Sequence, residues 1–256
     1  MNTTVQVTRI ELAQFLADTL QTSKINDYCP NGLQVEGIDQ IKVLVSGVTA
    51  NLALIDAAIA KQADAILVHH GYFWRGENPC ITGQKYQRIK KLIAHGINLF
   101  AYHLPLDLHP ELGNNAQLAR VLAFDCAAHC GEQGLVSVGT AANPALLTVG
   151  DLRDWIAHKL DRTPLLIGDP AQPLGRVAWC TGAAQSYLGA AIDAGATAFL
   201  SGEISEPTVH LARESGVAYL ACGHHATERY GVQAVGEAIA GRFNIEHHFI
   251  DIPNPV

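Results

Sequence analysis

The sequence repeats itself in its two halves, and this repetition limits the possible folds more than any other feature. Residues 57–70 can be aligned with residues 190–203 without a gap. Farther along, residues 95–101 match residues 215–221, and each stretch leads a strand into a loop that carries histidine and carboxylate. The repetition predicts that one α/β unit occurs twice. A competing interpretation, that any two α/β segments rich in Ala and Gly look alike, stays open at this point.

Short β-branched runs alternate with helical patterns in the first half. A helix is predicted over residues 8–20, because Thr8 and Glu11 form a capping-box pattern ahead of apolar residues at helical spacing. Predicted strands and helices then alternate, at 43–45, 52–61, 65–68, 86–94, 98–102 and 115–122. This alternation is typical of mostly parallel sheets with helices on their faces. We expect two similar α/β domains from an internal duplication, the first over residues 1–125 and the second over residues 126–256.

Composition and charge exclude several classes of protein. The 256 residues are 48% hydrophobic and 16% charged, so the chain is packed rather than disordered. The net charge of −7 argues against a surface that coats DNA or an anionic membrane. The first nine residues lack the order of a secretory signal, and no apolar run approaches the roughly 18 residues of a membrane helix. The six cysteines form no C-x-x-C pair, which indicates free thiols in a cytoplasmic protein.

Two histidines follow a predicted strand of the first half, at the edge of the sheet where α/β proteins bind ligands. His69 and His70 come directly after the strand at residues 65–68. Adjacent side chains on a strand point to opposite faces, so both imidazoles can reach one site only if the chain turns. Gly71 permits such a turn. A His-His pair by itself is weak evidence for a metal site.

Carboxylates and imidazoles also follow two later strands. His103, Asp107 and His109 share a loop in which Pro105 and Pro110 limit the freedom of the chain. In the second half, His224 and Glu228 lie four residues apart, so a helix would place both on one face. Glu228 has a second interpretation, as a solvated carboxylate paired with the neighbouring Arg229.

These side chains together form a nitrogen and oxygen ligand set without a thiolate. The set is His69, His70, Asp107, His224 and Glu228, with His103 and Glu203 as nearby candidates. Five ligands exceed the needs of one tetrahedral zinc and suit two ions roughly 3.5–4 Å apart. Zinc, iron, manganese and nickel all accept such ligands. The sequence contains no H-E-x-x-H, P-loop, G-x-G-x-x-G or G-x-S-x-G motif.

The order of these motifs resembles the NIF-three-like dinuclear-metal proteins, which are often labelled GTP cyclohydrolase I type 2 homologs. The resemblance covers the whole chain and is carried by residues 31–34, His69 to Trp74 (H-H-G-Y-F-W), 103–107, 223–228 and 250–255. It implies two interlocked α/β domains, a toroidal homohexamer with sites facing an inner cavity, and the five side chains above as metal ligands.

The ligand set leads to a functional hypothesis with two rivals. Two divalent ions per subunit would lower the pKa of a shared water in a hydrolase-type enzyme, with His103 and Glu203 as orienting or proton-shuttling groups. The cyclohydrolase label implies a nucleotide substrate. The rival hypotheses are a non-catalytic metal-binding scaffold or carrier ring, and an iron-dependent oxygenase. The acidic net charge argues against direct DNA binding.

Overall fold

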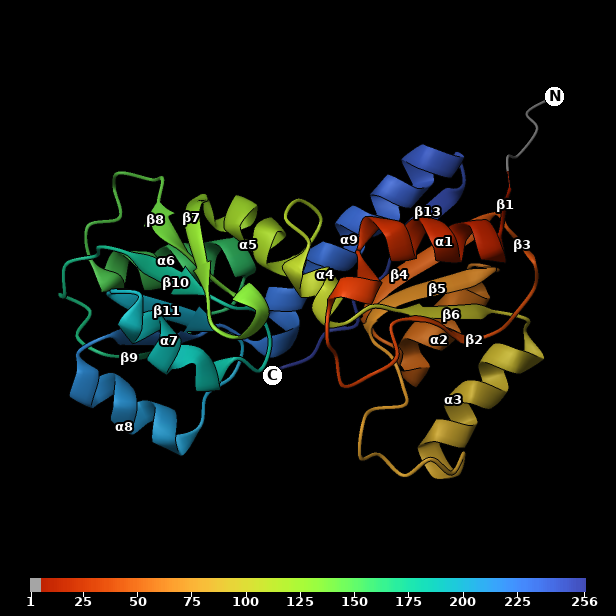
Figure 1. Ribbon diagram of the computed structural model, residues 1–256, viewed down its shortest axis with the longest axis horizontal. Coiled ribbons are helices and arrows are strands. Elements are labelled where there is room, and N and C mark those ends of the chain that lie inside the picture. The colour runs from red at the N-terminus through yellow and green to blue at the C-terminus, as the bar shows by residue number, and fades with distance from the viewer. Residues whose placement is uncertain (1–5) are drawn as a thin grey trace. The chain divides into compact units, whose positions relative to one another are not determined.

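The computed structural model describes residues 6–256 and, over that range, divides the chain into two compact units (Figure 1). The first unit extends to Gly113 and includes Gly231–Ile252; the second consists of Asn114–Tyr230 and Pro253–Val256. Residues 1–5, part of the stretch on which the absence of a secretory signal was argued, lie outside the described residues. Among the residues described, no helix has the length and apolar character needed to cross a membrane.

The first unit is built on a largely parallel sheet with the strand order β13-β4-β5-β6-β2. Its strands are β2 (Gly32–Val35), β4 (Val43–Thr49), β5 (Ala65–His70), β6 (Asn98–Ala101) and β13 (Glu246–Phe249). The pairings from β13 through β6 are parallel, and β2 closes one edge in antiparallel orientation. A separate small ladder joins β1 (Val7–Thr8) to β3 (Gln40–Ile41).

Helices cover both faces of this sheet. The helices are α1 (Arg9–Thr19), α2 (Leu52–Ala60), α3 (Gly83–Ala94), the five-residue α4 (Leu104–Leu108), and α9 (His224–Phe243), which starts in the second unit. Apolar residues of α1 and α9 pack with Leu44 and Leu67 on one face. Apolar residues of α2 and α3 pack with Val45 and Ile66 on the other. Consecutive strand residues therefore enter different cores, as the two-residue period of a strand requires.

Local sequence explains where the helices begin. The capping box predicted for α1 is present, since the Thr8 hydroxyl accepts from the Glu11 N–H while the Glu11 carboxylate accepts from the Thr8 N–H. The Asn51 side chain caps α2 by accepting from the N–H of Leu54. These contacts satisfy backbone donors that the first turn of a helix leaves without intrahelical partners.

The second unit carries a mixed sheet with the order β7-β8-β10-β11-β12-β9. Its strands are β7 (Phe124–Cys130), β8 (Val136–Ala141), β9 (Leu165–Ile167), β10 (Val177–Trp179), β11 (Ala198–Ser201) and β12 (Ala218–Ala221). Its helices are α5 (Asn114–Leu122), α6 (Val149–Leu160), α7 (Leu188–Asp193) and α8 (Glu206–Ser215). Single 3-10 turns lie at Glu132–Gly134 and Gln185–Tyr187 in this unit and at Thr22–Lys24 in the first. Apolar residues of α5 and α6 pack with Trp179, Leu200 and Leu220 of the sheet.

Strand register in the two sheets follows the repeat found in the sequence. Ala65 pairs with Leu44 and Asn98 in the first sheet, and its aligned counterpart Ala198 pairs with Val177 and Ala218 in the second. The prediction of an α/β protein with helices flanking its sheets is confirmed.

Two details differ from the sequence prediction. In the second sheet only the β10–β11 and β11–β12 pairings are parallel, whereas β7–β8, β8–β10 and β12–β9 are antiparallel. The chain also divides after Gly113 rather than after residue 125, and Gly231–Ile252 belongs to the first unit rather than the second. The reason is packing: Val232, Val235 and Ile239 of α9 lie in the first unit's core, and β13 pairs with β4.

Candidate metal centre

His69 and His70 lie at the carboxyl end of β5, where the sequence placed a ligand edge. Their ring centroids are 4.5 Å apart; His69 is fully buried and His70 half-buried. Position 71 requires glycine because there is no room for a Cβ, which would overlap the Gln34 side chain and the Cβ of Ala101. A left-handed turn is not the reason. Gln34 in turn holds the chain after Gly71 through hydrogen bonds with both backbone groups of Tyr72.

His103 directly precedes α4, which follows β6, and Asp107 is the fourth residue of that helix. One Asp107 carboxylate oxygen lies 3.5 Å from Nε2 of His69, and both side chains are buried. His103 faces the same histidines, with ring centroids 5.0 Å from His69 and 5.9 Å from His70. His69, His70 and His103 each offer a ring nitrogen, and these atoms lie within 4.8 Å of one another. His109 is not part of this group, because its Nδ1 accepts from the N–H groups of Glu111 and Leu112.

The second unit contributes a separate group at the start of α9. Nε2 of His224 lies 3.0 Å from Oε2 of Glu228, as expected for residues four apart on a helix. Glu203 approaches the other side of the ring, with Oε1 2.7 Å from Nδ1. Glu228 is only 3% exposed, which excludes the interpretation as a solvated carboxylate. Gly182, at φ +69°, makes room for it, since a Cβ there would overlap the Glu228 carboxylate.

Electrostatics in this group favour a positive charge. Burial alone would lower the pKa of His224, but the hydrogen bonds and negative charges of Glu228 and Glu203 outweigh it and raise the pKa to about 9. A cation is therefore stabilised at this position, whether it is the ring proton or an ion that replaces it.

Every predicted histidine ligand is held by its Nδ1 atom. Nδ1 of His69 donates to the carbonyl oxygen of Tyr102 at 3.0 Å, Nδ1 of His70 is hydrogen-bonded to the Thr49 hydroxyl at 3.1 Å, and Nδ1 of His224 to Glu203. Metal-binding histidines typically use one ring nitrogen for the ion and the other for such an orienting partner. On the other side of the ring, Nε2 lies toward a carboxylate in two of the three residues, Asp107 for His69 and Glu228 for His224.

Asp27 is a residue that the sequence reasoning missed. Its side chain is 3% exposed and accepts from Nδ1 of His103 at 3.0 Å. It also accepts from the backbone N–H of Leu104 and from the Asn31 amide, both at 2.9 Å. Burial opposes ionisation of this carboxyl, but these hydrogen bonds and the charge of His103 lower its pKa well below the usual range. No spacing rule could reveal it, because it lies 76 residues before its partner.

Cys29 lies within ligand distance of Asp27 and His103, yet its chemistry does not suit an ion. Burial and the nearby charge of Asp27 raise the pKa of its thiol to about 12, so the thiolate that a metal would require is disfavoured. The donor set that remains, imidazole nitrogens and carboxylate oxygens, can hold zinc, iron, manganese or nickel.

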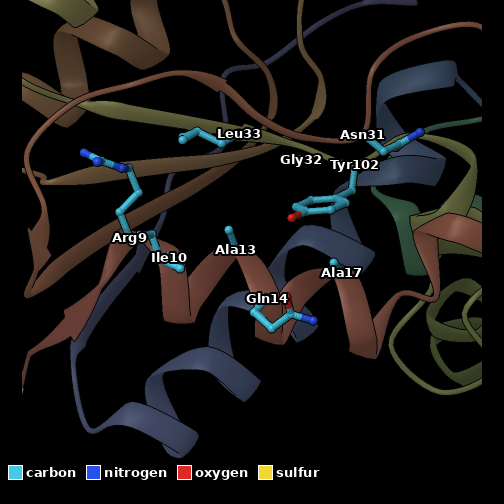
Figure 2. A pocket seen from close by; sticks show the side chains of 9 residues that line it. All are labelled: Arg9, Ile10, Ala13, Gln14, Ala17, Asn31, Gly32, Leu33 and Tyr102. Atoms are coloured by element: carbon cyan, nitrogen blue, oxygen red, sulfur yellow. The ribbon is translucent and has the colours of Figure 1, made fainter.

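Tyr102, whose carbonyl oxygen accepts the hydrogen bond from His69, also lines a pocket on the first unit. Figure 2 shows this pocket. The pocket has a volume of about 340 Å³ and lies between α1 and β2. It is lined by Arg9, Ile10, Ala13, Gln14, Ala17, Asn31, Gly32, Leu33 and Tyr102. The phenol is 1% exposed, and its hydroxyl has no hydrogen-bond partner among the described residues.

The structure thus gathers the predicted residues in two groups. Within the first unit it brings together His69, His70, Asp107 and His103. Within the second unit it brings together His224, Glu228 and Glu203. The union of the two groups in one centre stays a prediction.

The chain matches a known protein family over nearly its whole length. Residues 7–255 match the model of the Duf34/NIF3 (NGG1p interacting factor 3) family, and the chain belongs to that family. This confirms the resemblance drawn from the motifs.

Named relatives and solved structures agree with this membership. A protein from Pseudomonas aeruginosa named "GTP cyclohydrolase 1 type 2 homolog" is 55% identical, over 92% of this chain and 94% of that protein. The solved structure of a protein of unknown function, ybgI, is 46% identical with a TM-score of 0.93, covering 98% of this chain and all of the other. A solved protein from Thermus thermophilus, TTHA1606, is 29% identical with a TM-score of 0.81, over 98% of this chain and 100% of that one.

Proposed function

We propose that this protein binds two divalent metal ions per subunit and uses them in a hydrolase-type reaction on a small-molecule substrate. The observation that supports this most strongly is the shared arrangement of the histidines: each is hydrogen-bonded at Nδ1, and Nε2 of His69 and of His224 lies toward a carboxylate. A cluster of imidazoles that served packing alone would not require the same nitrogen of each ring to be held by an orienting partner.

The proposed ligands are His69, His70, Asp107, His224 and Glu228. We infer that His224 and Glu228 of the second unit join the first-unit residues around one centre, because each group alone offers too few donors for two ions. When bound, the ions lower the pKa of a shared water toward neutrality and polarise the substrate. Zinc, iron, manganese and nickel are equally compatible with this donor set.

The protein's own contribution to proton transfer is assigned to His103. Because Nδ1 of His103 donates to Asp27, its Nε2 is left as an acceptor facing His69 and His70. A buried carboxylate behind an imidazole holds the tautomer and stabilises the ring once it is protonated. His103 would thus take a proton from the activated water, while Glu203 orients the His224 ring.

Substrate, assembly and location are proposed on the same basis. The relatives' name, GTP cyclohydrolase 1 type 2 homolog, supports a nucleotide as substrate, and the net charge of −7 argues against nucleic acid as a partner. We also propose a toroidal homohexamer, as the family resemblance implies, and a cytoplasmic location, as the scattered cysteines without a C-x-x-C pair indicate.

Elemental analysis of the purified protein tests the first step. We expect about two equivalents of metal in the wild type and a large loss in His69→Ala and Glu228→Gln, with His210→Ala unchanged as a control, because His210 is an exposed helix residue beside Glu206. Thermal unfolding of each variant separates metal loss from misfolding. Protein that carries no metal, or variants that retain it, would overturn the proposal.

Incubation with nucleotides and phosphoesters tests the second step. We expect turnover in metal-loaded wild type and none in Glu228→Gln. Full metal occupancy without turnover on any compound would favour a metal-binding scaffold or carrier instead. Oxygen consumption restricted to the iron-loaded protein would favour an oxygenase.

A further inference from the structure

Aromatic side chains gather beside the histidines of the first unit. The rings of Tyr28, Trp74 and His103 are in mutual contact and are called here the aromatic wall. Ring centroids lie 5.7 Å apart for Tyr28 and Trp74, and 4.9 Å apart for Trp74 and His103. Trp74 also lies 6.1 Å from the ring of His70. The wall therefore adjoins the proposed ligands.

The outer rings of the wall belong to the surface rather than to a core. Tyr28 is 49% exposed and Trp74 is partly exposed. Neither residue belongs to the buried apolar clusters of the first unit. Large aromatic groups kept at the surface beside polar side chains are typical of binding sites, where one ring face is available to a ligand.

Two loops that present these rings are fixed to each other. The backbone N–H of Arg75 donates to the carbonyl oxygen of Tyr28 at 2.7 Å, and its guanidinium donates to the carbonyl oxygen of Asp27 at 3.1 Å. Phe73, next to Trp74, has φ +67°, an unfavourable conformation for an aromatic residue. Such a conformation persists only where the surroundings hold it, and it is concentrated at functional sites.

The carboxylates beside the wall are already engaged in holding it. Each oxygen of Asp27 accepts two hydrogen bonds, from Tyr28 N and His103 Nδ1 on one and from Asn31 Nδ2 and Leu104 N on the other. Glu77 accepts from the N–H of Trp74 and pairs with Lys85 at 2.9 Å. A guanine is distinguished from other bases by donors on its edge, which require an acceptor such as a carboxylate. Asp27 has no acceptor position left for that task, and each oxygen of Glu77 already has a partner in its own part of the chain.

We propose that the aromatic wall binds a planar conjugated heterocycle of purine size by stacking on Tyr28 and Trp74, next to His70 and His103. The aromatic wall contacts the face of the heterocycle and not the hydrogen-bonding groups on its edge. Guanine and adenine therefore bind with similar affinity. This inference rests on the proposed function for the position of the site. It specifies the size of the ring system that binds. Unlike the name GTP cyclohydrolase, it does not specify which purine base is bound.

Calorimetric titration of the full-length, metal-loaded protein tests the inference, with guanosine, adenosine, uridine and ribose as probes. We expect guanosine and adenosine to bind with affinities within about threefold of each other, uridine more weakly, and ribose not measurably. Stacking of a base on an aromatic ring corresponds to roughly five- to 150-fold in affinity. Trp74→Ala should therefore weaken guanosine and adenosine binding by about tenfold or more, and Trp74→Phe should restore most of it.

A control variant and a second readout keep this test decisive. Trp155→Phe removes an indole from α6 of the second unit and should leave nucleoside binding unchanged. Metal content should be unchanged in Trp74→Ala, because no proposed ligand is altered. If the purified wild type contained no metal, the proposed function would be refuted, but the measured nucleoside affinities would still test the stacking proposal. Guanosine binding more than tenfold tighter than adenosine binding would overturn the inference. Equal affinities in Trp74→Ala and wild type, or no nucleoside binding at all, would do the same.

Discussion

Replacing Asp27 with asparagine should destabilise the protein strongly while changing its shape very little. The carboxylate accepts four hydrogen bonds with almost no exposure to solvent. An asparagine oxygen can accept two of these, and its amide would then face two donors that have lost their acceptor. At about 1.5 kcal/mol for each lost bond to a charged group, the loss in free energy of unfolding is about 3 kcal/mol.

Thermal and urea unfolding measure this loss. For a chain of this length, about 3 kcal/mol corresponds to a decrease in Tm of roughly 6–12 °C. Asp18→Asn is a suitable control, since Asp18 is on the outer face of α1 and accepts from Gln14 on the same helix. A decrease of less than 1 °C in Asp27→Asn would refute the assignment of Asp27 as the residue that holds His103 and α4.

The dependence of this effect on pH has a definite sign. The pKa of Asp27 in the folded protein lies below the ordinary value of 3.8, so the ionised carboxylate stabilises the folded state. That contribution is fully present above pH 3.8 and is lost as the pH falls toward the folded pKa. The stability difference between wild type and Asp27→Asn should therefore be constant near neutrality and shrink below about pH 4. A difference that grew with acidification would contradict this reasoning.

Three further variants test other features of the two units. Tyr102→Phe removes a buried hydroxyl without a hydrogen-bond partner among the described residues. We expect thermal unfolding to show unchanged stability or a gain of up to about 1 kcal/mol. A clear loss of stability would show that the hydroxyl has a hydrogen-bond partner. Gly182→Ala should lower the free energy of unfolding by about 2 kcal/mol or more and abolish metal binding, because φ of Gly182 is +69° and a Cβ there would overlap Glu228. The control Gly189→Ala in α7 should leave stability unchanged or raise it. Equal stabilities of the two variants would contradict the role of Gly182. Glu203→Gln should weaken metal binding about 10- to 100-fold in a chelator competition, and an unchanged affinity would remove its orienting role.

Patterns within short windows gave reliable predictions in this chain. The capping box of α1, the alternation of strands and helices, and the pairing of His224 with Glu228 all depend on residues a few positions apart. The strand register agrees with the repeat, because aligned residues of the two halves occupy matching rungs of their sheets. The place of His69 and His70 at the carboxyl end of β5 agrees with the rule that parallel sheets bind ligands at their carboxyl ends.

Features that join distant segments could not be predicted in the same way. The Asp27–His103 pair spans 76 residues, and neither residue carries a local sign of the other. The left-handed conformation of Phe73 contradicts the preference of its residue type, so only its surroundings explain it. The return of Gly231–Ile252 to the first unit is likewise set by the apolar residues available to pack there.

The sequence by itself determined the class of fold, the twofold repetition and the types of donor atom, because periodicity, capping and strand-end placement act over a few residues. The tertiary structure decided which nitrogen of each imidazole is held by an orienting partner and which carboxylates are engaged. Hydrogen bonds between remote segments make that choice, and their energy depends on geometry that no local pattern encodes.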